Sequence, residues 1–188
     1  RRKETDRDEE REGPRIYSDY FFMSTDQEST PILAVKFSRS KRIAATALPQ
    51  TGVTPFGVKF FAKFIAETGV RRFLNCSDNE PAILAHREAS ARACIGVESV
   101  PRSCPVGDHQ ANGSIEVAVR ELKRQMRAVR SALEQRLRKV LGDSDPILWW
   151  IPTFFPETPS PDAGEVVTGR RRGRRRRGRG GAGPLWNS

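Results

Sequence analysis

Three acidic residues, far apart along the chain, lie where carboxylates could do chemistry. Asp19 lies inside the apolar segment YSDYFFM, Asp78 ends the segment FLNCSD, and Glu116 follows the polar stretch GDHQANGS. A charge within an apolar strand is costly unless it is paired or binds a metal. Cleavage and joining of phosphodiesters by two divalent ions, about 3.5–4 Å apart, needs carboxylates that converge from different elements. The three acids therefore predict a site for two Mg²⁺ or Mn²⁺ ions.

Each acid also has a purely structural interpretation. Asp19 could be an ordinary residue at a strand end or turn, and Asp78 could be a turn and helix-capping residue. Glu116 could simply favour the positive end of a helix dipole from its first turn. Asp26 is a rival first carboxylate, although STDQEST is typical of a turn, and Asp108 could offer a fourth acid.

The predicted strands could bring the first two acids together. Five segments are rich in strand-forming residues: IYSDYFFM, PILAVKF, RIAATAL, RRFLNCSD and VESVPRSCPV. The short turn SRSK predicts a meander of the first three strands, and the proline in the last segment predicts an interrupted edge strand. If the first and fourth strands are neighbours, about 4.8 Å apart, Asp19 and Asp78 can share a metal.

The predicted helices separate and cover these strands. Helical spacing appears in FGVKFFAKFIAETG, which Gly69 should end, and in ILAHREASARACIG. A long amphipathic helix running to about Gly142 is predicted from one apolar stripe: Ile115, Val119, Leu122, Met126, Val129, Leu133 and Leu137. DPILWWIPTF predicts the start of another buried helix, cut short by Pro152.

This order of elements predicts an α/β fold, a mixed five-stranded sheet with helices on both faces. We expect residues 15–155 to form one folded core. Residues 1–14 carry mixed charge without apolar periodicity and are expected to be a disordered linker. Residues 156–188 are Pro-rich and then Arg/Gly-rich, and are expected to be a disordered tail.

Three blocks of sequence resemble the catalytic blocks of DDE-type integrase cores, as found in copia-type retrotransposons and retroviruses. They are SDYFFM, CSDNEPAI and GDHQANGSIEVAVRELKRQMR. The third block is similar to the family pattern of a polar Gln/Asn/Gly loop, a Glu and a basic helix. Thirty-seven residues, 79–115, separate Asp78 from Glu116, close to the family interval. The resemblance covers about residues 15–155 and implies an RNase H-like fold.

The resemblance implies a polynucleotidyl transferase that processes DNA 3′ ends and joins them to target DNA, acting as a homo-oligomer. It makes Asp19, Asp78 and Glu116 the catalytic and metal-binding triad. Asn112 would lie in a mobile loop that touches the DNA end, and Arg120 and Lys123 would contact element DNA. The chain departs from the family in lacking its His-His-Cys-Cys zinc module, its usual C-terminal domain and a recognisable last core helix. These absences suggest a fragment, or an element-derived gene model with altered ends. The start without Met is expected for a piece of a longer polyprotein.

A basic row begins at the predicted metal site. Arg120, Lys123, Arg127 and Arg130 follow Glu116 at helical spacing, beside the apolar stripe. Such a row suits the phosphates of a DNA strand leading into the site. The alternative is a solvated face stabilised by pairs such as Arg130 with Glu134.

The tail carries the excess charge of the chain. The net charge is +10, and eight arginines lie between Arg170 and Arg179, without which 25 basic residues face 23 acidic ones. The tail predicts electrostatic binding to nucleic acid, DNA or RNA, without sequence preference. It could equally be a nuclear localisation signal, which favours an intracellular, nuclear protein.

Composition disfavours several other classes. No apolar run is long enough to span a membrane, and the first residues do not form a signal peptide. Cys76, Cys94 and Cys104 are expected to be reduced thiols, and zinc binding by Cys94, Cys104 and His109 is disfavoured by their spacing. Two other functions stay open: an inactive, element-derived nucleic-acid-binding domain, and another RNase H-like nuclease with four carboxylates.

Overall fold

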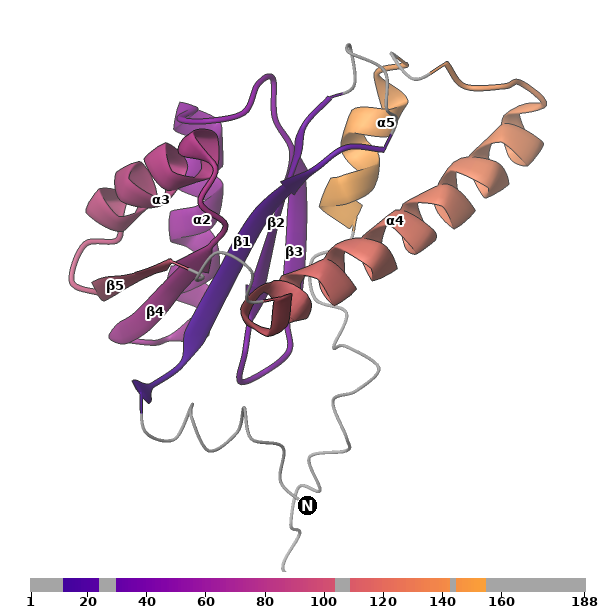
Figure 1. Cartoon of the computed structure of the whole chain (residues 1–188). Helices are drawn as coiled ribbons and strands as arrows, with labels where there is room; N and C mark the ends of the chain where they lie inside the picture. The colour runs from indigo at the N-terminus through magenta and orange to yellow at the C-terminus, as the bar shows by residue number, and fades with distance from the viewer. Residues whose placement is uncertain (1–11, 24–29, 104–108, 143–144, 155–188) are drawn as a thin grey trace, which may run out of the picture.

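A computed structural model describes residues 12–23, 30–103, 109–142 and 145–154, and its centre is one five-stranded sheet (Figure 1). The strands are β1 (Arg15–Phe21), β2 (Ile32–Phe37), β3 (Ile43–Ala47), β4 (Arg72–Ser77) and β5 (Glu98–Ser103). Their order across the sheet is β3-β2-β1-β4-β5. The first and fourth strands are therefore neighbours.

The sheet is mixed. β1, β2 and β3 form the predicted antiparallel meander, whereas β4 pairs parallel to β1 and β5 pairs parallel to β4. β5 lies at the edge, where Pro101 is tolerated because an edge strand needs ladder bonds on only one side. The predicted mixed α/β sheet with helices on both faces is confirmed.

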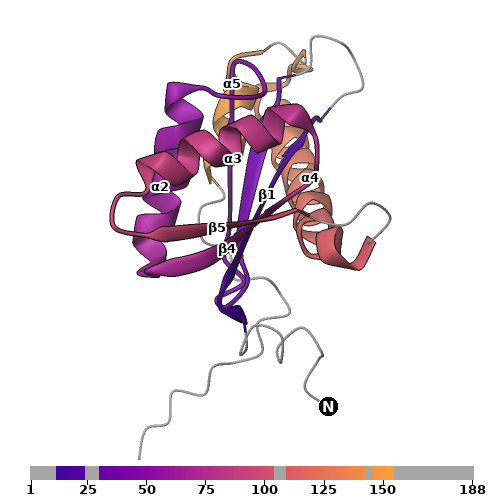
Figure 2. The same cartoon turned by 60° about the vertical axis from the view of Figure 1, so that its left-hand side comes forward.

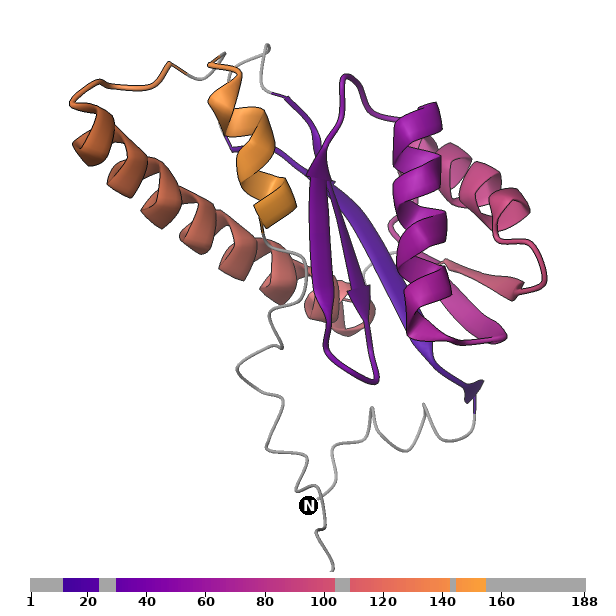
Figure 3. The same cartoon turned by 180° about the vertical axis from the view of Figure 1, so that it is seen from behind.

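Helices cover the two faces separately, as Figures 1 and 3 show. On one face α2 (Pro55–Thr68) and α3 (Pro81–Ala93) bury Phe61, Phe64 and Ile83 against the sheet. On the other face α4 (His109–Leu137) buries residues of its apolar stripe, including Leu122 and Met126. Because side chains alternate along a strand, β1 contributes to both cores.

The two ends of α2 follow from its sequence. The Thr54 side chain accepts a hydrogen bond from the Gly57 backbone N–H, 3.1 Å away, and Pro55 is the first helical residue. Gly69 ends the helix in the left-handed conformation, with φ of 68°, as predicted. Gly57 must lack a side chain, because a Cβ there would lie 2.8 Å from the Thr54 hydroxyl oxygen.

Helix α4 begins earlier than the sequence predicts. The stretch His109–Ser114, expected to belong to a flexible loop, forms its first turns. Glu116 therefore lies in the second to third turn rather than the first. The apolar stripe is buried at its amino-terminal end, but Leu137 is 50% exposed because the far end of α4 extends beyond the sheet (Figure 1). Within the described ranges, no helix has the length and apolar character needed to cross a membrane.

The end of the core is a short α5 (Ile147–Trp150) continued by the 3-10 helix η1 (Ile151–Phe154). η1 contacts β3 and α4, so this segment closes the core between the sheet and α4. The prediction of a buried helix is only partly right. Ile151 is buried, but Trp149 and Trp150 are 45% and 65% exposed. Pro152 lies inside η1 and does not stop the chain from packing.

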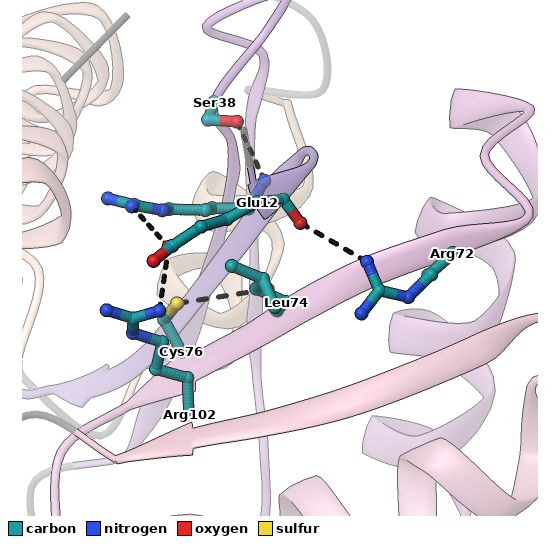
Figure 4. A network of polar contacts seen from close by, with 7 residues as sticks. Glu12, Ser38, Arg72, Leu74, Cys76 and Arg102 are labelled. Atoms are coloured by element: carbon teal, nitrogen blue, oxygen red, sulfur yellow. Dashed lines mark hydrogen bonds and ion pairs between the residues drawn. The ribbon is translucent and has the colours of Figure 1, made fainter. Parts of the chain in front are cut away.

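A polar network fixes the amino-terminal end of β1 (Figure 4). The Glu12 carboxylate accepts hydrogen bonds from Arg15 at 2.9 Å and Arg102 at 2.7 Å, and its carbonyl oxygen accepts one from Arg72 at 3.2 Å. The Arg15 N–H donates to the Ser38 hydroxyl oxygen at 2.9 Å. Glu12, which the sequence assigns to the linker, thus joins β1 to β4 and β5.

Candidate active site

The strand register brings Asp19 and Asp78 to the same level of the sheet. The last backbone pair between β1 and β4 is Ser18 with Ser77, and each Asp is the next residue. Asp19 shares a face of β1 with Tyr17, which packs in the core beneath α4. The alternation of β4, continued one residue past its end, directs Asp78 to that face too. Parallel neighbours are about 4.8 Å apart, so the two acids are adjacent.

Asp19 is a perturbed acid. Burial raises the pKa of its carboxyl to about 6, from an ordinary 3.8, while a hydrogen bond from the Tyr20 backbone N–H, 2.8 Å from Oδ1, acts in the opposite direction. The negative charges of Asp78, Glu80 and Glu116 contribute to the same rise. An acid surrounded by like charges in a partly buried position is typical of functional sites.

Glu116 approaches from α4, the third element. It is exposed on the helix surface and lies close enough to Asp19 to act on its pKa. The structure therefore brings the three predicted acids into one electrostatic neighbourhood, from β1, the end of β4 and α4. Asp78 does not cap α3, because Glu80 occupies the N-cap position, which removes the capping interpretation of Asp78.

Glu80 is an acid that the sequence interpretation missed. It is exposed and also raises the pKa of Asp19. Its place in the turn SDNEP, directly before Pro81 opens α3, could have singled it out. Within the described chain Glu80 is therefore a further acid that acts on Asp19, whereas Asp108 lies outside the described residues.

The acids suit a divalent cation in their chemistry. Carboxylate oxygens are the ligands that Mg²⁺ prefers, and their mutual repulsion at Asp19 is what a cation would relieve. In the residues that the structure describes, however, no three Asp, Glu, His or Cys side chains are placed closely enough to hold a metal ion together. Closure onto a metal would require these side chains to move toward one another.

A buried lysine, also missed in the sequence, ties the sheet to the start of α4. Lys36 on β2 is 6% exposed, and its Nζ donates a hydrogen bond to the Ser114 carbonyl oxygen at 3.0 Å. Ser114 lies two residues before Glu116. The strand segment PILAVKF gave no sign of this role, because a single Lys in a strand is more often solvated.

In the predicted basic row, two side chains are exposed to solvent and two make contacts within the described chain. Arg120 and Arg127 are exposed. The Lys123 ammonium lies 5.7 Å from the centre of the Phe21 ring, in cation–π range. Arg130 forms an ion pair with Glu134 at 3.1 Å and donates to the Leu141 carbonyl oxygen. The predicted ion pair of Arg130 with Glu134 is therefore present, although both side chains are only partly exposed.

Several predicted residues lie wholly or partly outside the described structure. Only the backbone of Asn112 is described, and it is helical rather than in a loop. Asp26, Cys104 and the tail lie outside the described residues. Cys76 and Cys94 are buried, and neither forms a disulfide within the described residues.

Comparisons with known proteins give a likeness in structure but not in sequence. No protein-family model matches the chain, and no curated protein matches its sequence. Among solved structures, the catalytic core domain of BIV integrase is similar with a TM-score of 0.43 and 19% sequence identity, over 62% of this chain and 71% of that chain.

Proposed function

We propose that the chain is an integrase-type catalytic core that processes DNA 3′ ends and joins them to target DNA. The observation that carries this proposal is the partly buried Asp19 of β1, whose pKa is raised first by burial and then by the charges of nearby acids, among them Asp78 and Glu116 from two other elements. The resemblance of the same three residues to the DDE blocks of integrases supports it independently of their geometry.

Asp19 and Asp78 would hold divalent cations where the pairing of β1 with β4 ends, and Glu116 would be the third carboxylate ligand, from α4. When bound, two Mg²⁺ or Mn²⁺ ions supply activation of the attacking oxygen and stabilisation of the leaving oxygen. Asp19 must lose its proton to become a ligand. With its pKa near 6, cation binding should strengthen as the pH rises through that value.

The exposed arginines of α4 would orient the DNA. Arg120 and Arg127 continue from Glu116 along the helix at steps of four and seven residues, so they lie on one side of it. Phosphate contacts of this kind fix the register of a strand without reading its sequence. Lys123, held over Phe21, would be a less mobile member of the same row.

The test is joining of a short DNA duplex to a target plasmid in Mg²⁺ or Mn²⁺. We expect Asp78→Asn to abolish joining, because it removes a ligand charge while keeping the size of the side chain. Glu88→Gln is the matched control, since Glu88 is an exposed acid on α3 paired only with Arg92 in the described chain. Joining that survives Asp78→Asn would refute the assignment.

An inactive nucleic-acid-binding domain is the second candidate. The absence, within the described ranges, of three metal-binding side chains at ligand distance favours it. Saturable Mn²⁺ binding that requires Asp19 would exclude this candidate.

A nuclease with four carboxylates is the third candidate, and Glu80 is the observation that favours it. Cleavage of an RNA–DNA hybrid without DNA joining, lost in Glu80→Gln, would support it. The same variant should leave an integrase-type activity largely intact.

Assembly into a homo-oligomer, nuclear localisation and binding of RNA by the Arg/Gly tail complete the proposal. Each has a direct measurement: light scattering of the purified chain, the cellular distribution of a tagged chain, and salt-dependent RNA binding with and without residues 156–188.

A further inference from the structure

A buried arginine lies behind the second acid of the site. Arg87 of α3 is only 9% exposed. Its Nη1 donates hydrogen bonds to the Ser77 hydroxyl oxygen at 3.2 Å and to the Arg102 carbonyl oxygen at 3.3 Å. One guanidinium thus connects α3 to the last residues of β4 and β5, which lie side by side near α3 in Figure 2.

The contact continues to Asp78. The Ser77 hydroxyl donates a hydrogen bond to the Asp78 carbonyl oxygen at 3.1 Å while it accepts the bond from Arg87. A hydroxyl has one proton to donate and can accept as well, so the guanidinium determines the direction of the Ser77 hydroxyl. The peptide that carries Asp78 is thereby held from the opposite face of the sheet.

The same residues enclose a short connection. Only residues 78–80 separate β4 from α3, and the Glu80 side chain provides no cap for the helix. The Arg87 contact links the helix back to the strand, so this connection is fixed at both ends. Burial of a guanidinium is costly, and within the described chain Arg87 has no carboxylate partner at ion-pair distance while its Nε has no hydrogen-bond partner.

We propose that Arg87 is a positioning residue for the candidate metal site, acting through Ser77 on Asp78. This inference rests on the proposed function, because it assigns Arg87 to the ligand geometry of the same site. Partners that orient metal ligands typically change metal affinity 10–100-fold when they are removed. Arg87 touches neither substrate nor metal.

The experiment measures Mn²⁺ binding to the full chain by electron paramagnetic resonance, without DNA, at a temperature where circular dichroism shows each variant folded. We expect Arg87→Met to weaken Mn²⁺ binding roughly 10-fold or more and Ser77→Ala to weaken it by a smaller factor. Arg92→Met is the matched control, since Arg92 is an exposed arginine on the same helix, and it should bind Mn²⁺ as the parent chain does.

A merely structural role for Arg87 would lower the melting temperature without changing Mn²⁺ affinity in the folded protein. That result, or parent-like affinity in Ser77→Ala together with Arg87→Lys, overturns the inference. If Arg87→Met does not fold, the Mn²⁺ affinities of Ser77→Ala and Arg87→Lys still test the inference. A parent chain that binds no Mn²⁺ contradicts the proposed function itself, so the two failures are distinguishable.

Discussion

Asp19 and Asp78 each directly follow the final pair of backbone partners, Ser18 and Ser77, between two parallel strands. This relationship places the two acidic residues at the same level of neighbouring strands although 58 residues, 20–77, separate them along the chain. It also helps to explain the raised pKa of Asp19, because burial and the negative charge of Asp78 both disfavour the ionised carboxylate. A site of concentrated negative charge is what a cation-dependent enzyme requires.

The carboxyl of Asp19 should destabilise the metal-free protein above pH 6. Its pKa is raised from 3.8 to about 6, so between these values the folded chain binds a proton that the unfolded chain lacks. The free energy of unfolding therefore falls as the pH rises through this window. The full penalty is up to about 3 kcal/mol, less where solvent screens the group.

Asp19→Asn should consequently raise the free energy of unfolding by about 2 kcal/mol at pH 8 and by little at pH 4. Urea unfolding in the presence of a chelator measures both values. Glu88→Gln, at an exposed acid, should change neither. Equal stabilisation by Asp19→Asn at the two pH values would contradict a raised pKa.

The exposed arginines of α4 should contribute phosphate contacts. Arg120→Ala and Arg127→Ala are each expected to weaken DNA binding uniformly across sequences and to reduce the slope of log affinity against log salt by about 1. Fluorescence anisotropy at several salt concentrations gives this slope.

Arg136 provides the control on the same helix. It lies sixteen residues beyond Arg120, about 24 Å along the axis, and is exposed in the last turn. Arg136→Ala should leave the salt slope closer to that of the parent chain. An equal effect of all three substitutions would indicate non-specific attraction rather than a row leading from the site.

The Lys36 contact should hold the start of α4 in place. Lys36→Met keeps the apolar stem but removes the hydrogen bond to the Ser114 carbonyl oxygen. Hydrogen bonds from charged groups contribute about 1.5–3 kcal/mol, so we expect a loss of stability of that order. Amide hydrogens in the first turns of α4 should exchange faster, whereas those of α2 should not. Unchanged exchange near Ser114 would argue against this role.

Much of the sheet follows from local sequence. The runs IYSDYFFM, PILAVKF and RIAATAL alternate or repeat strand-forming residues, and short turns between antiparallel strands leave few ways to arrange them. Gly69 ends α2 because only glycine adopts its backbone conformation without cost. Such signals act within a few residues, so they can be recognised without knowledge of the fold.

The beginning of α4 could not be predicted in the same way. Gly113 and the polar residues around it have low helix propensity, which favours a loop. Tertiary contacts override this preference: Ile115 is buried and the Ser114 carbonyl is held by Lys36. The exposure of Leu137 has the converse cause, because the apolar stripe continues past the edge of the sheet that it packs against.

The acids were recognisable, but their supporting residues were not. Asp19 lies within an apolar strand and Asp78 directly follows one, where an acid is unusual enough to be noticed. Lys36 and Arg87 have the same residue types as many solvated positions, and only the three-dimensional contacts show that they are buried. The turn SDNEP marks Glu80 as a candidate, but its relation to Asp19 depends on the pairing of β1 with β4.

The most direct test of a two-metal site is a crystal structure of the chain soaked in Mn²⁺ and measured with anomalous scattering. We predict two anomalous peaks about 3.5–4 Å apart, with carboxylate oxygens of Asp19 and Asp78 as ligands and Glu116 joining at least one ion. The expected movement is a closure of these side chains relative to the metal-free arrangement. Saturating Mn²⁺ with no peak between Asp19 and Asp78, or peaks that Glu116 cannot reach, would contradict the account.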